Sequence, residues 1–348
     1  MSSNIDHLPG WEQLAADPPP GLADAGSELL DAVRSELLMD DEWVVSGERE
    51  LLWWGAAQPL RITASHPRLF SGDATIKLTA SVRLLVDVAA DDYAVTGLIS
   101  ALNRMASIGA LVWLPQDREL IMHIAHYSYD GNEYFTKDFA PFALLAYTEA
   151  TARAHSFTES IGGTVATMPH PVSGYRLVPD QLMAVTENLV IPKGHSPNAW
   201  PNAELRALQQ DFRNRNYVAN ASENEFTVEF PFLRAGDPRT SQNTTALFQL
   251  MILVHPGYGT GLVAILRLPI RYESAEACVL ANQLNILEFG TRTGMSAFGS
   301  WCVDWDNSSL AHVSFIPNLY ARPGGRIASA VHAASYRADW AAHQLLGH

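Results

Sequence analysis

The chain is poor in cysteine and has no long apolar run. Cys278 and Cys302 are its two cysteines among 348 residues, and no Cys-x-x-Cys spacing is present. This usage predicts two reduced thiols and excludes a disulfide framework. The longest apolar run, 247–254, is interrupted by Gln249, so it is too short to cross a bilayer as a helix.

Basic residues are also scarce, with 23 Lys and Arg against 37 Asp and Glu, which gives a formal net charge of −14. Such a charge repels phosphate backbones and anionic membranes, so we expect neither nucleic acid nor a membrane as a partner. Residues 1–23 are polar, carry Pro18-Pro19-Pro20, and lack the basic and apolar regions of a secretory signal. We therefore expect a flexible N-terminal segment and a cytoplasmic protein.

The motifs of common catalytic sites are missing as well. There is no Gly-x-Gly-x-x-Gly after a strand, no Walker sequence, no Gly-x-Ser-x-Gly and no His-Glu-x-x-His. The glycine-rich run 257–261 joins two predicted strands and has no lysine or helix start that would hold a phosphate. We predict no catalytic residues and no cofactor, and enzymatic activity is left open with a non-enzymatic role favoured.

Histidine and aspartate pairs have structural explanations. His123 and His126 are three residues apart on a predicted strand, so they point to opposite faces and cannot share one metal ion. The spacing predicts one of them near the core and the other at the surface. Asp91-Asp92 stands at a predicted helix start and Asp304 and Asp306 at a predicted turn, positions where aspartate caps backbone N–H groups. No metal site is predicted.

The sequence does contain the same order of predicted secondary-structure elements in two places. An order of helix, three strands, helix, two strands and helix can be read in 24–157 and again in 202–348. The clearest strand is 76–88, where apolar and polar residues alternate over thirteen positions. The middle helices match through Leu102-Asn103 and Leu284-Asn285, and the following hairpins match through Leu120 and Leu310.

This repetition predicts the fold class: α+β, with two tandem αβββαββα units, antiparallel sheets with helices packed against them, and pseudo-symmetry. Between the units, 158–201 is rich in glycine and proline, and we expect it to be a linker or a strap laid over both halves. The domains are therefore 1–23 (flexible), 24–157 (first unit), 158–201 (linker or strap) and 202–348 (second unit).

Tryptophan supplies the candidate binding residues. Trp53 and Trp54 are adjacent on a predicted strand, so one indole must lie on each face. Trp301 and Trp305 bracket the second hairpin of the second unit. An indole that faces outward from a sheet offers a large rigid apolar surface, so these four residues are the predicted partner-binding residues.

The element order of both units resembles the type III secretion chaperone and YbjN-like fold, known in part from Tir-type chaperones. The resemblance covers about 250 residues, rests on element order, and carries over no binding residue. It implies an acidic, cytoplasmic chaperone that holds a segment of a protein client. The two tandem units would take the place of the two subunits of the usual dimer, so the protein would be a monomeric pseudo-dimer or a homodimer. Each unit would then be a chaperone-like domain.

Three functions are consistent with the sequence. The first is a non-enzymatic, protein-binding, chaperone-like module with an apolar groove on its sheets and Trp53 or Trp54 in the groove wall. The second is a ligand-sensing or enzymatic protein with a pocket between the halves, in which linker residues meet a strand histidine. Those linker residues are Tyr175, Arg176, Lys193 and His195. The third is a structural protein that self-associates through edge strands.

Overall fold

The computed structural model describes most of the chain. The described residues are 25–70, 73–105, 108–128, 133–184, 202–223, 225–232, 245–255, 258–290, 298–306, 308–317 and 326–346. The expected flexible segment 1–23 lies outside them.

The first half contains three long helices and one sheet. The helices are α1 (Ala25–Glu36), α2 (Asp92–Asn103) and α3 (Glu133–Ile161), and a short 3-10 helix, η2, spans Asp41–Trp43. The strands are β1 (Val44–Ser46), β2 (Glu50–Trp53), β3 (Leu60–Ala64), β4 (Arg68–Phe70), β5 (Asp73–Val86), β6 (Ala110–Leu114), β7 (Glu119–Ser128) and β8 (Thr164–Val165).

The second half repeats this plan. Its helices are α5 (Asn202–Asn214), α6 (Ser274–Gly290) and α7 (Arg326–Leu346). Its strands are β9 (Ala219–Ala221), β10 (Glu225–Pro231), β11 (Thr245–His255), β12 (Gly259–Arg271), β13 (Ser300–Val303) and β14 (Ser309–Pro317).

The two sheets have the same topology. The first runs β1-β2-β3-β5-β7-β6, with β4 and β8 also paired to β5, and the second runs β9-β10-β11-β12-β14-β13. All of these pairings are antiparallel. The predicted fold class, two αβββαββα units with antiparallel sheets, is therefore confirmed. The sequence pattern did not predict the short strands β1, β4 and β8 of the first unit or β9 of the second.

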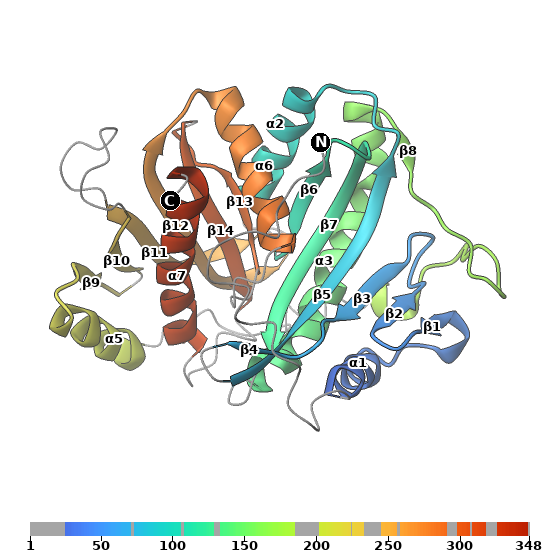
Figure 1. Ribbon diagram of the computed structural model, residues 1–348, viewed down its shortest axis with the longest axis horizontal. Helices are drawn as coiled ribbons and strands as arrows, with labels where there is room; N and C mark the ends of the chain where they lie inside the picture. Colours follow the sequence, from blue (N-terminus) through green and yellow to red (C-terminus); the bar gives the residue numbers. More distant parts are fainter. Residues whose placement is uncertain are drawn as a thin grey trace.

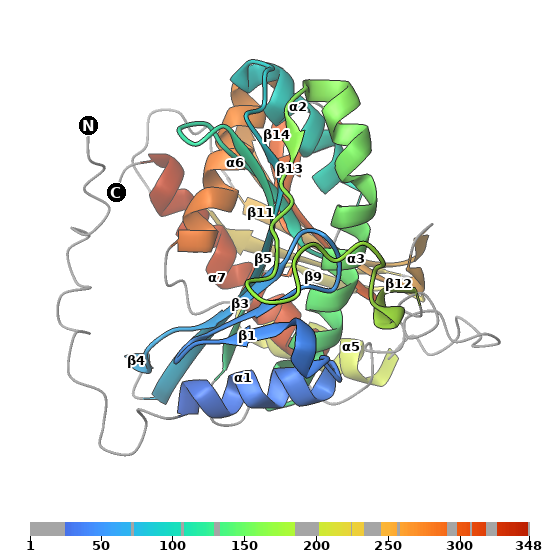
Figure 2. The ribbon, with the colours of Figure 1, turned by 90° about the vertical axis from the view of Figure 1, so that its right-hand side faces the viewer.

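Helices α3 and α7 cover opposite sides of the molecule. Figure 1 shows α3 behind the first sheet and α7 in front of the second, and Figure 2 places them on opposite sides as well.

In β5 the apolar and polar residues that alternate in the sequence also alternate in burial: Leu78, Ala80 and Val82 are buried, whereas Thr79 and Ser81 are half-buried. This is the pattern of a strand with one face against a core.

Helices α2 and α6 lie side by side where the two halves meet (Figure 1). Each of them contacts the innermost strand of its own sheet and the innermost strand of the other sheet, β6 and β13. The main apolar core is shared across this junction, because Val263, Ile265 and Phe315 of the second half join the core of the first. The halves therefore form one body and not two independent domains.

Each half closes the inner edge of its own sheet with an asparagine. In the first half, Asn103 Nδ2 donates to Leu111 O, and Leu111 N donates to Asn103 Oδ1, both at 2.9 Å. In the second half, Asn285 makes the same pair of bonds with Trp301, at 2.9 and 2.8 Å. The repeated Leu-Asn of the sequence thus has one structural role in both halves.

A second set of bonds joins each inner edge to the other half. Asn282 of α6 exchanges two bonds of 2.9 Å with the backbone of Trp113 on β6. At the equivalent place Ser100 Oγ of α2 accepts from Val303 N of β13 at 2.9 Å. A buried strand edge needs such partners, because an unpaired buried N–H or C=O is costly. Gly299 N also donates to Ile108 O at 2.7 Å, and the positive φ of Gly299, 96°, favours glycine there.

Helix α3 contains a proline: the helix begins at Glu133, and Pro141 lies inside it and not in its first turn. Phe139 and Ala140 are fully buried against the sheet, and this packing outweighs the local preference of proline for a helix start. Of the predicted linker or strap, residues 162–184 pack on the first half; the remainder, 185–201, lies outside the described residues, so a strap over both halves stays a prediction.

Replacement of Asn282 by alanine tests the junction. The change leaves the buried N–H and C=O of Trp113 without these partners, so the free energy of unfolding should fall by about 2–5 kcal/mol. Denaturant unfolding measures it. Gln283→Ala is the matched control, because Gln283 is an exposed residue of the same helix. Equal stability of the two variants would contradict the role given to Asn282.

Candidate functional site

Three of the four candidate tryptophans are buried. The ring of Trp53 lies 5.7 Å from that of Tyr147 on α3, and Trp301 lies 5.3 Å from His312 and packs into the core of the second half. Trp54 is 1% exposed. The expected outward position is therefore wrong for Trp53, Trp54 and Trp301, because helices or the segment after α3 cover the sheets at these points.

Trp305 is the exception, with 62% of its surface exposed in the turn between β13 and β14. The guanidinium of Arg104, at the end of α2, lies 4.3 Å from its ring centre. Arg104 also donates to Asp304 O at 3.2 Å. Trp305 is thus a solvent-facing indole held by a cation–π contact from the other half.

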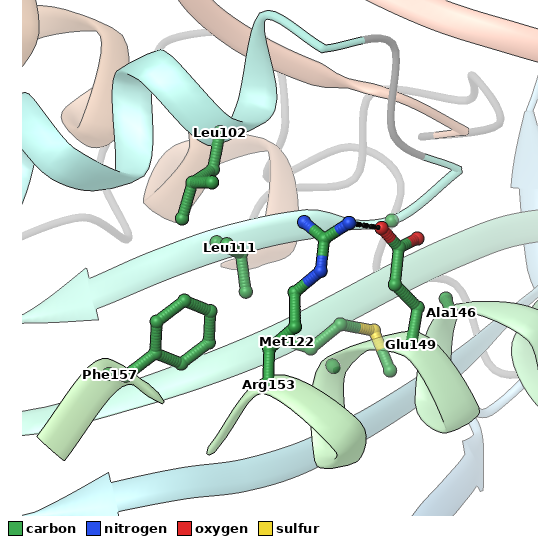
Figure 3. Close-up of a pocket in the computed structure, with 9 residues that line it drawn as sticks. Leu102, Leu111, Met122, Ala146, Glu149, Arg153 and Phe157 are labelled. Carbon is green, nitrogen blue, oxygen red and sulfur yellow. Dashed lines mark ion pairs between the residues drawn. The ribbon is translucent and has the colours of Figure 1, made fainter. Parts of the chain in front are cut away.

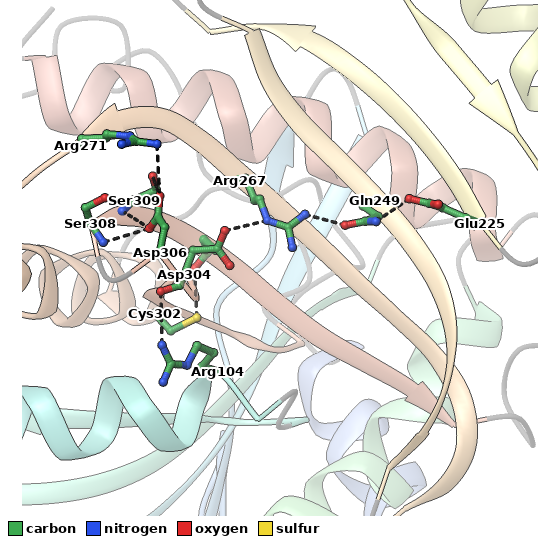
Figure 4. Close-up of polar contacts among 11 residues, drawn as sticks. Arg104, Glu225, Gln249, Arg267, Arg271, Cys302, Asp304, Asp306, Ser308 and Ser309 are labelled. Carbon is green, nitrogen blue, oxygen red and sulfur yellow. Dashed lines mark hydrogen bonds and ion pairs between the residues drawn. The ribbon is translucent and has the colours of Figure 1, made fainter.

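A row of polar side chains, each hydrogen-bonded to the next, extends from this turn across the second sheet (Figure 4). Asp304 Oδ2 accepts from Arg267 Nε at 2.7 Å, and Arg267 Nη1 donates to Gln249 at 2.5 Å. Gln249 in turn donates to Glu225. These pairings fill a row across β10–β12 with charged and amide groups, so no apolar groove continues along the row from Trp305.

The aspartates of this turn have structural roles, as predicted. Asp306 accepts from the backbone of Ser308 and Ser309 and from the hydroxyl of Ser309, at 2.6–2.9 Å. Slight burial raises its pKa, but these hydrogen bonds outweigh burial and lower the pKa to about 2. At the helix start, Asp91 accepts from Ala94 N at 2.9 Å and caps α2.

Residues 162–184, here called the strap, are fixed to the outer part of the first half. Figure 1 shows the strap leaving β8 and running down past β2. Met168 N donates to Ala57 O at 3.1 Å, and the indole of Trp54 donates to Met168 O at 2.8 Å. Trp54 is therefore buried by the strap and serves to hold it.

Arg176 is the second anchor of the strap. Its Nη1 donates to Trp54 O at 2.7 Å, and its Nη2 pairs with Asp180 at 2.9 Å. Its guanidinium also lies 4.9 Å from the ring centre of Trp43. A paired and stacked arginine fixes the backbone on both sides of it.

The anchored strap turns apolar side chains toward solvent. Val172 and Leu177 are 89% and 88% exposed, and Val178 and Tyr175 are exposed as well. These four residues form the apolar strap face. Four exposed apolar residues lie within seven positions of one segment, and such a concentration makes the segment a candidate interaction surface. Apolar residues within 172–178 of a Gly- and Pro-rich linker were a readable signal for this face, but their exposure was not.

A small pocket lies between α2, the β6–β7 hairpin and α3 (Figure 3). Its walls are apolar, and an ion pair of 2.6 Å between Glu149 and Arg153 stands at its mouth. Burial raises the pKa of Glu149, and Arg153 opposes that rise. The lining residues are Leu102, Gly109, Leu111, Met122, Ala146, Glu149, Ala150, Arg153 and Phe157.

His123 and His126 lie on opposite faces of β7, as predicted, but both are buried. The ring of His126 is 6.3 Å from Phe139 on α3, and that of His123 is 4.1 Å from Phe289 on α6. The expected surface position of one histidine is wrong because α6 of the second half covers that face. Burial lowers the pKa of His126 to about 3, and burial and then the charge of Lys77 lower that of His123 well below its usual value.

Lys77 and Glu288 bring buried charge to the same junction. Lys77 Nζ donates to the carbonyls of Glu288 and Phe289 near the end of α6, the former at 3.3 Å. The Glu288 carboxylate accepts from Arg337 at 2.8 Å. Burial lowers the pKa of Lys77 to about 8, although the charge of Glu288 raises it. These contacts tie β5, α6 and α7 together.

The polar site expected between the halves is not formed by its described members. Arg176 binds Trp54 and Asp180 at the outer part of the first half, whereas His123 lies against α6. Lys193 and His195 lie outside the described residues. Within the described ranges, no three His, Cys, Asp or Glu side chains form a metal-binding group.

No family model, no curated protein and no solved structure matches this chain. Among the described residues, no helix is long and apolar enough to span a membrane.

Substitution of His123 by leucine tests whether this buried histidine is structural. Neither ring nitrogen has a hydrogen-bond partner among the described residues, so the variant should be as stable as the wild type at pH 7, or more stable. The folded-state pKa lies below the unfolded value. The wild type therefore loses stability as the pH falls below 6.5, and the variant should lose about 1.4 kcal/mol less per pH unit.

Denaturant unfolding between pH 4.5 and 7 measures this difference. His66→Leu, a replacement of an exposed histidine, is the control. An unchanged slope for His123→Leu would show that this histidine is not held neutral in the fold.

Proposed function

We propose that this chain is a non-enzymatic, protein-binding module of the chaperone-like kind, in which two covalently joined halves stand in for a dimer. The observation that carries the proposal is the apolar strap face. Val172, Tyr175, Leu177 and Val178 are exposed together on a segment whose backbone is fixed by Trp54 and Arg176. A fixed apolar surface binds an unfolded segment without first having to be ordered itself.

The character of the client follows from charge and from the sheet edges. The formal charge of −14 favours a basic client. The outer edge strands, β1 and β9, are three residues long, and asparagine or serine side chains close the inner edges. Strand addition therefore has little edge to use, and contacts of client side chains with the strap carry the binding.

The resemblance of each half to the type III secretion chaperone and YbjN-like element order supports the same proposal. The two halves meet through α2 and α6, as two copies of one subunit would meet in a dimer. The proposal keeps a cytoplasmic location and a monomeric pseudo-dimer or homodimer as its setting.

The strap face is tested by the triple variant Val172→Ser, Leu177→Ser and Val178→Ser. The probe is reduced hen lysozyme, a basic chain that aggregates when its disulfides are opened. The wild type should suppress this aggregation, measured by light scattering. The variant should need roughly tenfold more protein for the same effect, because it loses apolar contact area on three side chains.

The control is the double variant Val218→Ser and Val254→Ser, which alters exposed apolar residues away from the strap. It should behave as the wild type, and circular dichroism should show all proteins folded. Absence of suppression by the wild type, or equal suppression by the triple variant, would refute the proposal.

A further inference from the structure

The part of the apolar strap face that holds Leu177 and Val178 is fixed by an ion pair beneath it. Arg176 Nε donates to Val178 O at 3.2 Å, and Arg176 Nη2 pairs with Asp180 at 2.9 Å. Asp180 Oδ1 also accepts from Leu182 N at 2.8 Å. The side chains of Arg176 and Asp180 are only 12% and 14% exposed, so their charges are used on each other. Leu177 and Val178 are therefore presented in one arrangement that binding does not have to order.

The other end of the apolar strap face is fixed by His170. Its Nδ1 accepts from Val172 N at 3.3 Å and from Ser173 N at 3.0 Å. Its ring lies 4.8 Å from that of Trp54 and 5.7 Å from that of Trp43. The strap is thus held at both ends against two indoles of the first half.

Trp43 also brings acidic side chains to the border of the strap. It is the last residue of η2, and its ring centre lies 4.9 Å from the guanidinium of Arg176. Asp41 and Glu42 precede it in η2, and Asp40 is the N-cap of this helix. All three acidic residues are exposed, and they are here called the acidic rim. The acidic rim and the apolar strap face therefore meet at Trp43.

The border has an excess of negative charge. Arg34 of α1 pairs with Asp41 of the rim, and Arg176 is already paired with Asp180. Charges are screened over about 8 Å at physiological ionic strength, so groups beside the face act more strongly on a bound segment than the rest of the chain does. The side chains that complement this border are those of lysine and arginine.

We propose that the strap and the acidic rim together bind one kind of client segment, in which apolar residues alternate with lysine or arginine. The apolar side chains pack on the apolar strap face, and the basic side chains pair with the acidic rim. Exposed pairs of this kind contribute modestly to affinity and more to the choice of partner. The inference rests on the proposed function and names the client of the same surface.

The direct test uses short dansylated peptides built of Leu-Val-Lys, Leu-Val-Glu and Ser-Ser-Lys repeats. With the full chain, the Leu-Val-Lys peptide should bind saturably, measured by fluorescence anisotropy. The other two should bind roughly tenfold more weakly, because one has the wrong charge and the other lacks apolar contact area. The difference between the Lys and Glu peptides should shrink at about 1 M salt, where charges are screened within about 3 Å.

Two matched variants locate the charge effect. Asp41→Asn with Glu42→Gln removes two charges of the acidic rim, and the affinity for the Leu-Val-Lys peptide should fall about fivefold. Glu223→Gln with Glu273→Gln removes the same number of charges from exposed positions of the second half, and the affinity should stay as in the wild type. Circular dichroism should show both variants folded, since all four side chains are exposed.

The inference is overturned if the wild type does not bind the Leu-Val-Lys peptide or binds the Lys and Glu peptides equally. It is also overturned if the rim variant binds as the wild type does, or if the control variant loses as much affinity as the rim variant. None of these results is needed to judge the proposed function. Suppression of lysozyme aggregation by the wild type, and its loss in the triple strap variant, would leave that function standing while the client named here is wrong.

Discussion

The junction of the two halves depends on how the inner edges of both sheets are closed. A strand edge carries N–H and C=O groups that must find partners when water is removed. Here Asn103 and Asn285 bind the edges of their own sheets, and Asn282 and Ser100 bind the edges of the opposite ones. The position of α2 and α6, the shared core and the burial of His123 all follow from this closure. The interface around these edges can be apolar because the N–H and C=O groups of the edge strands already have hydrogen-bond partners.

Within this common frame the two halves have diverged. The strap and its apolar face lie on the first half, whereas the self-paired polar row from Asp304 to Glu225 lies on the second. At one matched position the second half has Trp301 and the first has Leu111, and an asparagine binds the backbone of each. The duplicated frame supplies the geometry, and the differences between the halves supply the candidate binding surfaces.

The element order was predictable because it depends on local patterns. The alternation of 76–88 and the Leu-Asn pair at matched places in two helices are properties of short segments, and both halves follow them. Burial of Trp54 and His123 was not predictable, because the strap and α6 that cover them lie far away in the sequence. The outward position was wrong for Trp53, Trp54 and Trp301 for the same reason: an indole on a strand is exposed only if nothing distant packs on it. The asparagines in the apolar helices did carry a readable signal, since a buried amide needs backbone partners.

Joining the halves in one chain changes which substitutions the molecule can accept. In a symmetric homodimer a single mutation alters both sides of the interface, and each new side chain must suit two environments at once. In this chain a mutation alters one side only, and the covalent link keeps the halves together while one contact weakens. The asymmetric pair Asn282 and Ser100 shows the result: two bonds on one side and one on the other, at positions that a homodimer would have to keep identical. A fused pair can thus acquire a new surface on one half while the other half preserves the fold.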